Sequence, residues 1–364
     1  MTQEMNAFEK EKLCKKELVI TEKERIFRKA QGYDCGFVYQ EKKVWFSNER
    51  VTEFEEKFRN RFPDVNLECK KWTDGILIKV DGNPIAFTGK EFIAIFDECK
   101  ETRFLNISDW DVSDGKYFMR MFYGCECLES LNLSNWNVNN GKDFTDMFYK
   151  CKSLQELDIS NWDVSNSRSF YGMFESCMSL QSLDISSWDV SNCDCFSRMF
   201  SYCEKLQSID LSDWNVSNGK RFNDMFFHCK NLQALNIFSW NVSNCKRFES
   251  MFFMCENLQE LDLSDWDVSS GEDFAYMFYS CSNLQELDLS NWDVSNGKNF
   301  ENMFFKCKSL ELLDISGWNL SSGKYFKDMF YCCKSLKKIY ARGCNEMTIS
   351  ILSKMKPKNC ELIV

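Results

Sequence analysis

The chain has 364 residues, of which 44% are hydrophobic and 27% are charged, and its formal net charge is −10. This composition is typical of a folded protein and excludes an intrinsically disordered one. Residues 1–81 hold 17 basic and 16 acidic residues, so the excess of acid follows residue 81. An acidic array disfavours a nucleic-acid partner, whose backbone needs clustered Lys and Arg. No run of about 18 apolar residues is present, so we expect no membrane insertion.

The segment 1–82 is predicted to form a small α+β domain. Charge and apolar spacing indicate five elements, namely a helix over 4–30, a strand over 36–46, a helix over 49–62 and strands over 65–71 and 75–80. The last two strands are expected to pair around Gly75, and the turn Asp81-Gly82-Asn83-Pro84 is the expected boundary. The N-terminus lacks the apolar stretch of a secretory signal, which predicts a cytoplasmic protein.

From residue 92 onward the chain repeats every 26 residues. Nine of the eleven tryptophans keep this step without a slip, namely Trp110, Trp136, Trp162, Trp188, Trp214, Trp240, Trp266, Trp292 and Trp318. Ten of the twenty cysteines keep it too, from Cys99 to Cys333. Several residue columns locked to one period indicate a stack of similar structural units.

One unit begins at Phe274 and reads FAYMFYSCSNLQELDLSNWDVSNGKN. Its first half has the apolar spacing of an amphipathic helix, with Phe274, Met277, Phe278, Cys281 and Leu284 on one side. Leu287 and Leu289 then alternate with acidic residues, which predicts a short strand with one buried face. Residues 295–297 predict a polar turn.

Stacking such units would bury an apolar face that one unit cannot cover alone. Strands lie about 4.8 Å apart in a parallel sheet, whereas helices need about 10 Å each. This mismatch predicts a curved array with the strands on its concave face. We therefore expect an α/β fold over residues 83–344, closed over residues 345–364 by a C-terminal cap. The cap should contain a helix near 348–355 and a last strand at 360–364.

The spacing Leu284-x-x-Leu287-x-Leu289-x-x-Trp292-x-Val294 resembles the leucine-rich-repeat pattern, with Trp in place of the usual Asn. The half M-F-x-x-C-x-x-L-x-x-L resembles the repeat of the BspA-like leucine-rich-repeat surface proteins, over roughly residues 92–343. This resemblance implies a right-handed leucine-rich-repeat solenoid of about ten 26-residue units with a binding or adhesion role. It also implies a surface location, which the missing export signal does not support.

The cysteine columns are interpreted as small buried residues. A disulfide needs Cα atoms about 4.4–6.8 Å apart, and cysteines on neighbouring helices would lie nearer 10 Å apart. Unpaired thiols favour a reducing compartment. Zinc sites need paired C-x2-C motifs, which this sequence does not contain, so we expect neither a metal nor a cofactor.

Two columns of acidic residues are expected to face outward. The strand column holds Asp158, Asp184, Asp210, Asp262, Asp288 and Asp314, with Asn132 and Asn236 in the same register. The column that follows each Trp holds Asp111, Asp163, Asp189, Asp267 and Asp293, and turn capping by these residues would offset part of the repulsion between like charges. These columns predict either a surface for a basic partner or for cations, or a solvated face without a partner.

The regularity of the strand face breaks at Phe238 and again near the C-terminal end. Leu312, Lys338, Tyr340 and Arg342 there replace the polar or acidic residues of other units. Tyr and Arg are favoured interface anchors, so these five residues form the predicted contact surface. Contact of the last four with the C-terminal cap is the alternative.

Catalysis has little support in the sequence. His228 is the single histidine and lies in a variable column, and neither a phosphate loop nor a dinucleotide-binding fingerprint is present. We therefore predict a protein that is not an enzyme, a binding scaffold whose concave face contacts another protein. The alternatives are a cell-surface adhesin of the BspA-like type and a recognition array attached to an N-terminal effector domain, in which Cys14, Cys35 and Cys69 are the conceivable nucleophiles.

Overall fold

The computed structural model describes residues 44–46, 66–72, 75–81, 96–97, 100, 103–106 and 112–364. The chain divides into two compact units. The first unit comprises residues 1–167 and 177–183, and the second comprises residues 168–176 and 184–364. The predicted boundaries at residues 82 and 344 stay predictions.

The first unit contains an antiparallel sheet of three strands. These are β1 (Val44–Phe46), β2 (Asn66–Trp72) and β3 (Gly75–Asp81), in the order β1-β3-β2. β2 and β3 pair from Asn66↔Asp81 to Trp72↔Gly75, which confirms the hairpin predicted around Gly75. The helices predicted over 4–30 and 49–62 lie outside the described residues.

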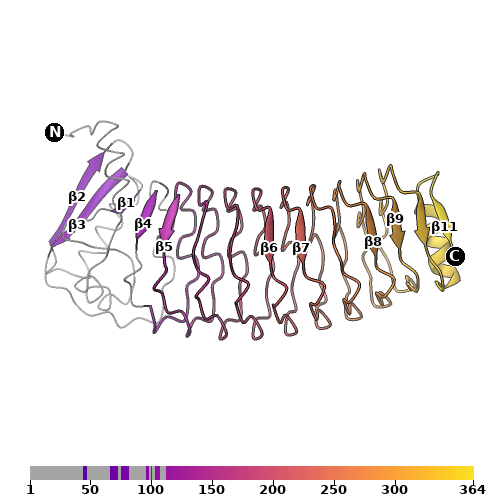
Figure 1. The fold of residues 1–364 in the computed structure, drawn as a ribbon, viewed down its shortest axis with the longest axis horizontal. Helices are drawn as coiled ribbons and strands as arrows, with labels where there is room; N and C mark the ends of the chain where they lie inside the picture. The colour runs from indigo at the N-terminus through magenta and orange to yellow at the C-terminus, as the bar shows by residue number, and fades with distance from the viewer. Residues whose placement is uncertain are drawn as a thin grey trace. The chain divides into compact units, whose positions relative to one another are not determined.

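The repeats carry short strands that pair in parallel, as the leucine spacing predicts (Figure 1). In the first unit β4 (Phe104–Asn106) pairs with β5 (Ser130–Asn132). In the second unit the strands are β6 (Ser208–Asp210), β7 (Ala234–Asn236), β8 (Glu286–Asp288), β9 (Leu312–Asp314) and β10 (Lys338–Tyr340). β6 pairs with β7, and β8 and β10 flank β9. Paired residues occupy the same position of adjacent repeats, as in Glu286↔Leu312, so each repeat forms one turn of a β-solenoid.

The predicted row of helices is wrong. From Phe to Cys of each repeat, the chain forms a run of tight turns, and Met277 N–H donates to the Phe274 carbonyl three residues earlier (3.3 Å). The neighbouring Phe278 N–H instead donates to the Met303 carbonyl of the next repeat (2.9 Å). In an α-helix every such N–H would bond four residues back along the same chain. The hydrogen bonds of this segment therefore alternate between its own turns and the next repeat.

Backbone dihedral angles show why this segment leaves the helical path. Two residues in each turn run have a positive φ, as Tyr276 (59°) and Ser280 (56°) do in the repeat that starts at Phe274. A left-handed residue interrupts a right-handed helix. The apolar spacing of three and four residues is the same in a chain of such turns, so periodicity alone could not separate the two structures.

Repeats are closely spaced on both sides of the solenoid. Centroids of the Phe274 and Phe300 rings on the turn side lie 5.4 Å apart, and the indoles of Trp266 and Trp292 lie 6.4 Å apart. The wide helix spacing that predicted a curved array with a concave strand face is therefore absent from these repeats. We use "strand face" for the outward side chains from the short strand through the residue after each Trp. We use "turn side" for the segment from two residues before each repeated Phe to one residue after each repeated Cys.

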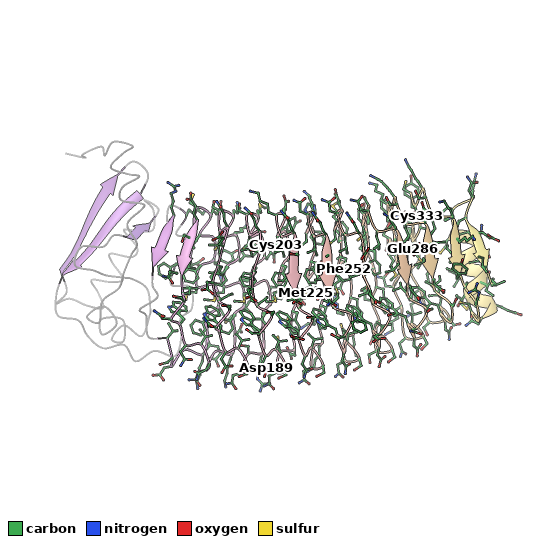
Figure 2. The ribbon with its side chains drawn as sticks, in the orientation of Figure 1. Asp189, Cys203, Met225, Phe252, Glu286 and Cys333 are labelled. Carbon is green, nitrogen blue, oxygen red and sulfur yellow. The ribbon has the colours of Figure 1, made fainter. Side chains whose placement is uncertain are left out.

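The core consists of the repeated apolar columns, which are buried throughout residues 112–320 (Figure 2). The indole N–H groups from Trp214 to Trp318 and the thiols of the repeated cysteines donate to carbonyls of the preceding repeat. Trp292 Nε1 donates to the Leu263 carbonyl (3.0 Å), and Cys281 Sγ donates to the Phe252 carbonyl (3.2 Å). The sixteen cysteines whose side chains are described form no disulfide. The sequence argument against disulfides relied on a spacing of about 10 Å between neighbouring helices. That spacing is wrong, because the turn runs of adjacent repeats are hydrogen-bonded to each other.

A helix and a strand close the C-terminal end, as predicted. Helix α4 (Glu346–Met355) starts at Asn345, whose side chain accepts from Thr348 N–H (2.8 Å). Strand β11 (Glu361–Ile363) pairs in parallel with β10 (Figure 1). Thr348 Oγ1, fully buried, accepts from Leu320 N–H (2.9 Å) and so joins the helix to the last full repeat. No helix within the described residues is long and apolar enough to cross a bilayer.

Candidate functional site

The strand face presents one regular row of side chains per repeat. In β8 the central Leu287 is buried, while Glu286 and Asp288 on either side of it are exposed. The same alternation holds in β6 and β7. Successive residues of a strand point to opposite faces, so the sequence places these acidic side chains outward.

The predicted aspartates of the strand column lie within the described residues. Their side chains accept hydrogen bonds that stabilise the turn after each strand position. Asp262 Oδ1 accepts from Ser264 N–H (3.0 Å) and from Ser264 Oγ–H (2.7 Å). Asn132 makes the same two bonds to Ser134. Equivalent bonds to the serine two residues later are made by Asp158, Asp184, Asp210, Asp288 and Asp314. One oxygen of each carboxylate thus has a local structural role, and an amide oxygen can replace it.

The column after each Trp also caps a turn, as the sequence predicts. Asp267 Oδ1 accepts from Ser269 N–H and Asp189 Oδ1 from Ser191 N–H, both at 3.0 Å. These bonds from serine lower the pKa of both carboxyls below the ordinary aspartate value. The carboxylates are therefore charged at neutral pH and remain so well into the acid range.

Four of the predicted contact residues lie together at the C-terminal end of the strand face. Lys338 is the direct neighbour of Leu312, and Tyr340 is the neighbour of Asp314 in the parallel pairing of β9 with β10. The Arg342 guanidinium carbon lies over the Tyr340 ring, 4.7 Å from its centroid. The register thus brings Leu312, Lys338, Tyr340 and Arg342 into one patch. The alternative, contact with the C-terminal cap, is confirmed for Lys338 and Tyr340, which pair with Glu361 and Ile363 of β11. Whether the four residues also bind a partner stays a prediction.

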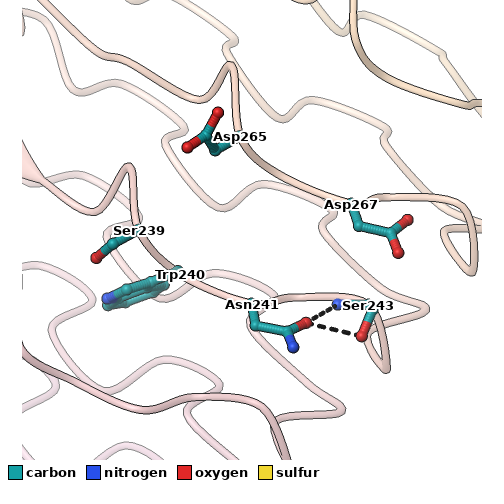
Figure 3. A pocket seen from close by; sticks show the side chains of 6 residues that line it. All are labelled: Ser239, Trp240, Asn241, Ser243, Asp265 and Asp267. Atoms are coloured by element: carbon teal, nitrogen blue, oxygen red, sulfur yellow. Dashed lines mark hydrogen bonds between the residues drawn. The ribbon is translucent and has the colours of Figure 1, made fainter.

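Phe238 lies elsewhere on the strand face. It occupies the column of Arg342 but comes four repeats earlier, which is about 19 Å away at the usual strand spacing. Its side chain is 42% exposed, and it replaces the serine that caps the turn in most other repeats. A hollow of about 370 Å³ adjoins this strand end, lined by Ser239, Trp240, Asn241, Ser243, Asp265 and Asp267 (Figure 3).

Sequence reasoning missed the distribution of charge along the array. Residues 248–297 contain eleven Asp or Glu and no Lys or Arg. Those on the strand face and its loops are Glu260, Asp262, Asp265, Asp267, Glu286, Asp288 and Asp293. A charge count in a sliding window would have found this block, whereas the column-by-column comparison hid it because each repeat looks alike.

A second polar cluster lies on the turn side and is an ion-pair network. Arg198 contacts the buried Glu175 (3.6 Å) and Asp224 (3.8 Å), and burial raises the pKa of the Asp224 carboxyl. Nearby, burial lowers the pKa of His228 and raises that of the Cys229 thiol. A thiol with a raised pKa is a poor nucleophile, so this pair does not resemble an activated Cys-His site. Within the described residues, no three His, Cys, Asp or Glu side chains are grouped as metal ligands.

Comparison with protein families gives one match that covers most of the array. The family described as "Mycoplasma protein of unknown function, DUF285" matches residues 90–207, 158–259 and 221–342. These ranges together span well over half of the chain. A search of curated proteins finds no match.

Comparison with solved structures gives only distant likenesses. The chain is 17% identical to a chain in the crystal structure of a TLR13-ssRNA13 complex, with a TM-score of 0.26, over 77% of this chain and 50% of that one. It is 14% identical, with a TM-score of 0.32, to a chain in the octameric complex of Latrophilin 3, Unc5D and FLRT2, over 72% and 83%. A TDR receptor is 17% identical, with a TM-score of 0.29, over 65% and 43%. This chain thus spans only half or less of the TLR13 chain and of the TDR receptor chain. TM-scores this low support no conclusion about function.

Proposed function

The chain belongs to the DUF285 family, and we propose that its repeat array is a non-catalytic protein-binding scaffold whose strand face takes a basic partner. The observation that supports this most is the block of residues 248–297, which has eleven acidic and no basic residues. An extended, regular face with one sign of charge steers an oppositely charged partner and selects against partners of like charge.

The strand face differs from the turn side in how its charges are balanced. On the turn side Glu272 forms ion pairs with both Lys246 and Lys298 of the adjacent repeats. On the strand face, Glu260 and Glu286 have no ion pair within the described chain. Like charges on adjacent strands repel each other, so a bound cation-bearing segment would relieve that repulsion.

Phe238 and the hollow beside it supply a plausible anchor for such a segment. The Phe238 side chain is exposed and directly precedes Ser239, which lines the hollow together with Asp265 and Asp267 of the next repeat. A Lys or Arg side chain has an apolar stem that can pack on a ring while its charged end reaches a carboxylate. The predicted patch around Tyr340 offers a second contact area on the same face.

The test neutralises strand-face carboxylates without disturbing the turns. We choose Glu260→Gln, Asp262→Asn, Glu286→Gln and Asp288→Asn, because Asn already makes the capping bonds at Asn132. Binding of the full chain is measured on an array of basic, neutral and acidic peptides of equal length. The wild type should bind basic peptides in a salt-dependent manner, and the variant should bind them about tenfold or more weakly.

The matched control carries the same number of neutralisations on the turn side, namely Glu256→Gln, Glu272→Gln, Asp273→Asn and Glu301→Gln. It changes the net charge equally and should keep wild-type binding. Equal weakening in both variants would mean that total charge, rather than the strand face, attracts the peptides. Indifference of the wild type to peptide charge would rule out the proposal.

We place this scaffold in the cytoplasm, because a chain with many cysteines and no disulfide among the described ones suits a reducing compartment. The BspA-like resemblance supports the alternative of an adhesin at the cell surface. Cys127 is exposed and so reports on location. A maleimide that cannot cross membranes should leave Cys127 unlabelled on intact cells and label it after lysis. Labelling on intact cells would favour the adhesin.

A further inference from the structure

We propose that the basic partner of the strand face is a second copy of this chain, docked antiparallel about a two-fold axis that runs along β9. This inference rests on the proposed function, since it uses the same acidic face and names what covers it. The self-complementarity of that face carries the argument, because the chain that bears the acidic block also bears a basic surface beside it.

The charge of the second unit changes sign along its length. Residues 248–297 have eleven acidic and no basic residues, whereas residues 324–364 have nine Lys or Arg and three Asp or Glu. Both segments belong to the second unit. Between them, residues 298–323 contain three basic and three acidic residues. On the strand face itself, the first segment presents acids such as Glu286 and Asp288 and the last presents Lys338 and Arg342, so a copy turned end for end lays Lys338 and Arg342 over the acidic repeats of the other.

Strand register fixes where the symmetry axis must lie. Glu286, Leu312 and Lys338 are direct neighbours on β8, β9 and β10, one strand on either side of Leu312. A two-fold axis along β9 therefore places each Lys338 opposite Glu286 of the copy. It also places Leu312 against Leu312 of the copy. An isologous interface requires this kind of self-matching.

The side chains involved are available for this contact. Glu286 and Lys338 are exposed, and neither forms an ion pair within the described chain. Leu312 is half-buried in a column that holds Glu260 and Glu286 in the two preceding repeats. Leu312 at the axis has the acidic Glu286 on one side and the basic Lys338 on the other. An interface with a small apolar centre and a charged rim has this arrangement.

The neighbouring row matches as well. Asp288 and Tyr340 flank Asp314 in the same register, so the axis brings the Tyr340-Arg342 pair towards Asp288 of the copy. The Arg342 guanidinium stacks on the Tyr340 ring, which holds it on this face. Two elements are unfavourable, because like charges repel: the axis brings two copies of the Asp314 carboxylate together, and it turns Glu361, the neighbour of Lys338 on β11, towards the acidic repeats of the copy.

The experiment measures self-association of the purified full chain by sedimentation equilibrium, with no other protein present. Wild type should dimerise at low salt and dissociate as salt screens the contacts. Lys338→Glu and Glu286→Lys should each raise the dimer dissociation constant on the order of tenfold or more, because each creates two like-charge contacts. An equimolar mixture of the two variants should dimerise like wild type, since both contacts are then between opposite charges.

A second variant separates this arrangement from any general attraction for basic proteins. Asp314→Asn keeps the turn-capping bond to Ser316, as Asn does elsewhere in the column, but removes the repulsion at the axis. It should tighten the dimer several-fold, whereas loss of an acid would weaken binding to an unrelated basic partner. Circular dichroism checks that each variant is folded.

Three results would overturn the inference. These are a wild type that stays monomeric at low salt and about 100 µM, a dimer that the mixture of charge variants does not restore, and a dimer that Asp314→Asn weakens. A monomeric chain that still binds basic peptides through the strand face would leave the proposed function standing. A chain that dimerises as described but binds no peptide would confine the function to self-association.

Discussion

At the scale of the residue, the core is held by side chains that bond to the backbone of the preceding repeat. Trp266 Nε1 donates to the Ile237 carbonyl (2.9 Å), and Trp292 repeats the bond to Leu263. Cys255 and Cys281 do the same through sulfur, each to the carbonyl of a Phe in the preceding repeat (3.2 Å for both). The indole and thiol columns therefore join adjacent repeats by hydrogen bonds as well as by packing.

Trp292→Phe tests this role of the indole. The substitution leaves the buried Leu263 carbonyl without its donor and removes ring volume from a fully packed site. We expect a loss of about 2–4 kcal/mol in the free energy of unfolding. Urea denaturation followed by far-UV circular dichroism gives the value.

Tyr325→Phe is the control, because this ring is 58% exposed and forms no such bond to the preceding repeat. Its unfolding midpoint should stay within error of the wild type. A Trp292→Phe chain as stable as the wild type would show that the indole hydrogen bond contributes little.

At the scale of the element, the turn run replaces the expected helix because its hydrogen bonds reach the next repeat. Four alternate N–H groups in one run, from Phe274 to Ser280, donate to carbonyls of the next repeat at 2.7–2.9 Å. Left-handed residues allow the chain to alternate between bonding along itself and bonding sideways. Most of these positions hold residues other than glycine, which adopt a positive φ at a cost.

Ser250→Gly tests that cost. Ser250 has φ 56°, a conformation that glycine adopts without strain and that Gly172 adopts in its own repeat (57°). The substitution should raise the free energy of unfolding by about 0.5–1 kcal/mol. Thermal denaturation of both proteins checks the direction.

Ser295→Gly is the matched control, since Ser295 has no positive φ. There glycine should destabilise the fold, because it adds entropy to the unfolded chain without relieving strain. The same sign for both substitutions would contradict the explanation based on left-handed residues.

At the scale of the whole molecule, the two columns of outward aspartates make the free energy of unfolding depend on pH in the acid range. Bonds from serine lower the pKa of Asp189, Asp210, Asp262 and Asp267 below the ordinary value of 3.8. A lowered pKa means that the charged form is favoured in the folded state. Its stabilisation is present above pH 3.8 and is lost as pH falls through the lowered value.

We therefore expect the urea midpoint to fall as the pH drops from about 4 through the lowered pKa values of these carboxyls. A variant with Asp189→Asn, Asp210→Asn, Asp262→Asn and Asp267→Asn should lose less stability over this interval, because the amide keeps the capping bond but does not titrate. Asp224 and Glu249 act in the opposite direction, since burial raises their pKa, and they are unchanged in the variant. Identical acid profiles for the two proteins would disprove the assignment.

The sequence by itself determined everything that depends on period and alternation. The repeat period placed the Trp, Phe and Cys columns inside, the alternation around Leu287 placed Glu286 and Asp288 outside, and the changed residues after Cys344 indicated the cap with α4 and β11. These features follow from which side chains water excludes, and residue type specifies that directly. The four predicted contact residues around Tyr340 were chosen from their departure from the repeat, and the structure places them in one patch.

Only the tertiary structure decided what the segment from Phe to Cys becomes. Its apolar spacing suits a helix and a chain of turns equally, and the choice depends on carbonyls of the next repeat, such as that of Met303, which accepts from Phe278 N–H. Hydrogen-bond partners in the next repeat are invisible to a local pattern. For the site, the 26-residue step already placed Glu286, Leu312 and Lys338 in one column, and the parallel pairing of β8, β9 and β10 made them direct neighbours with opposite charges on either side of β9.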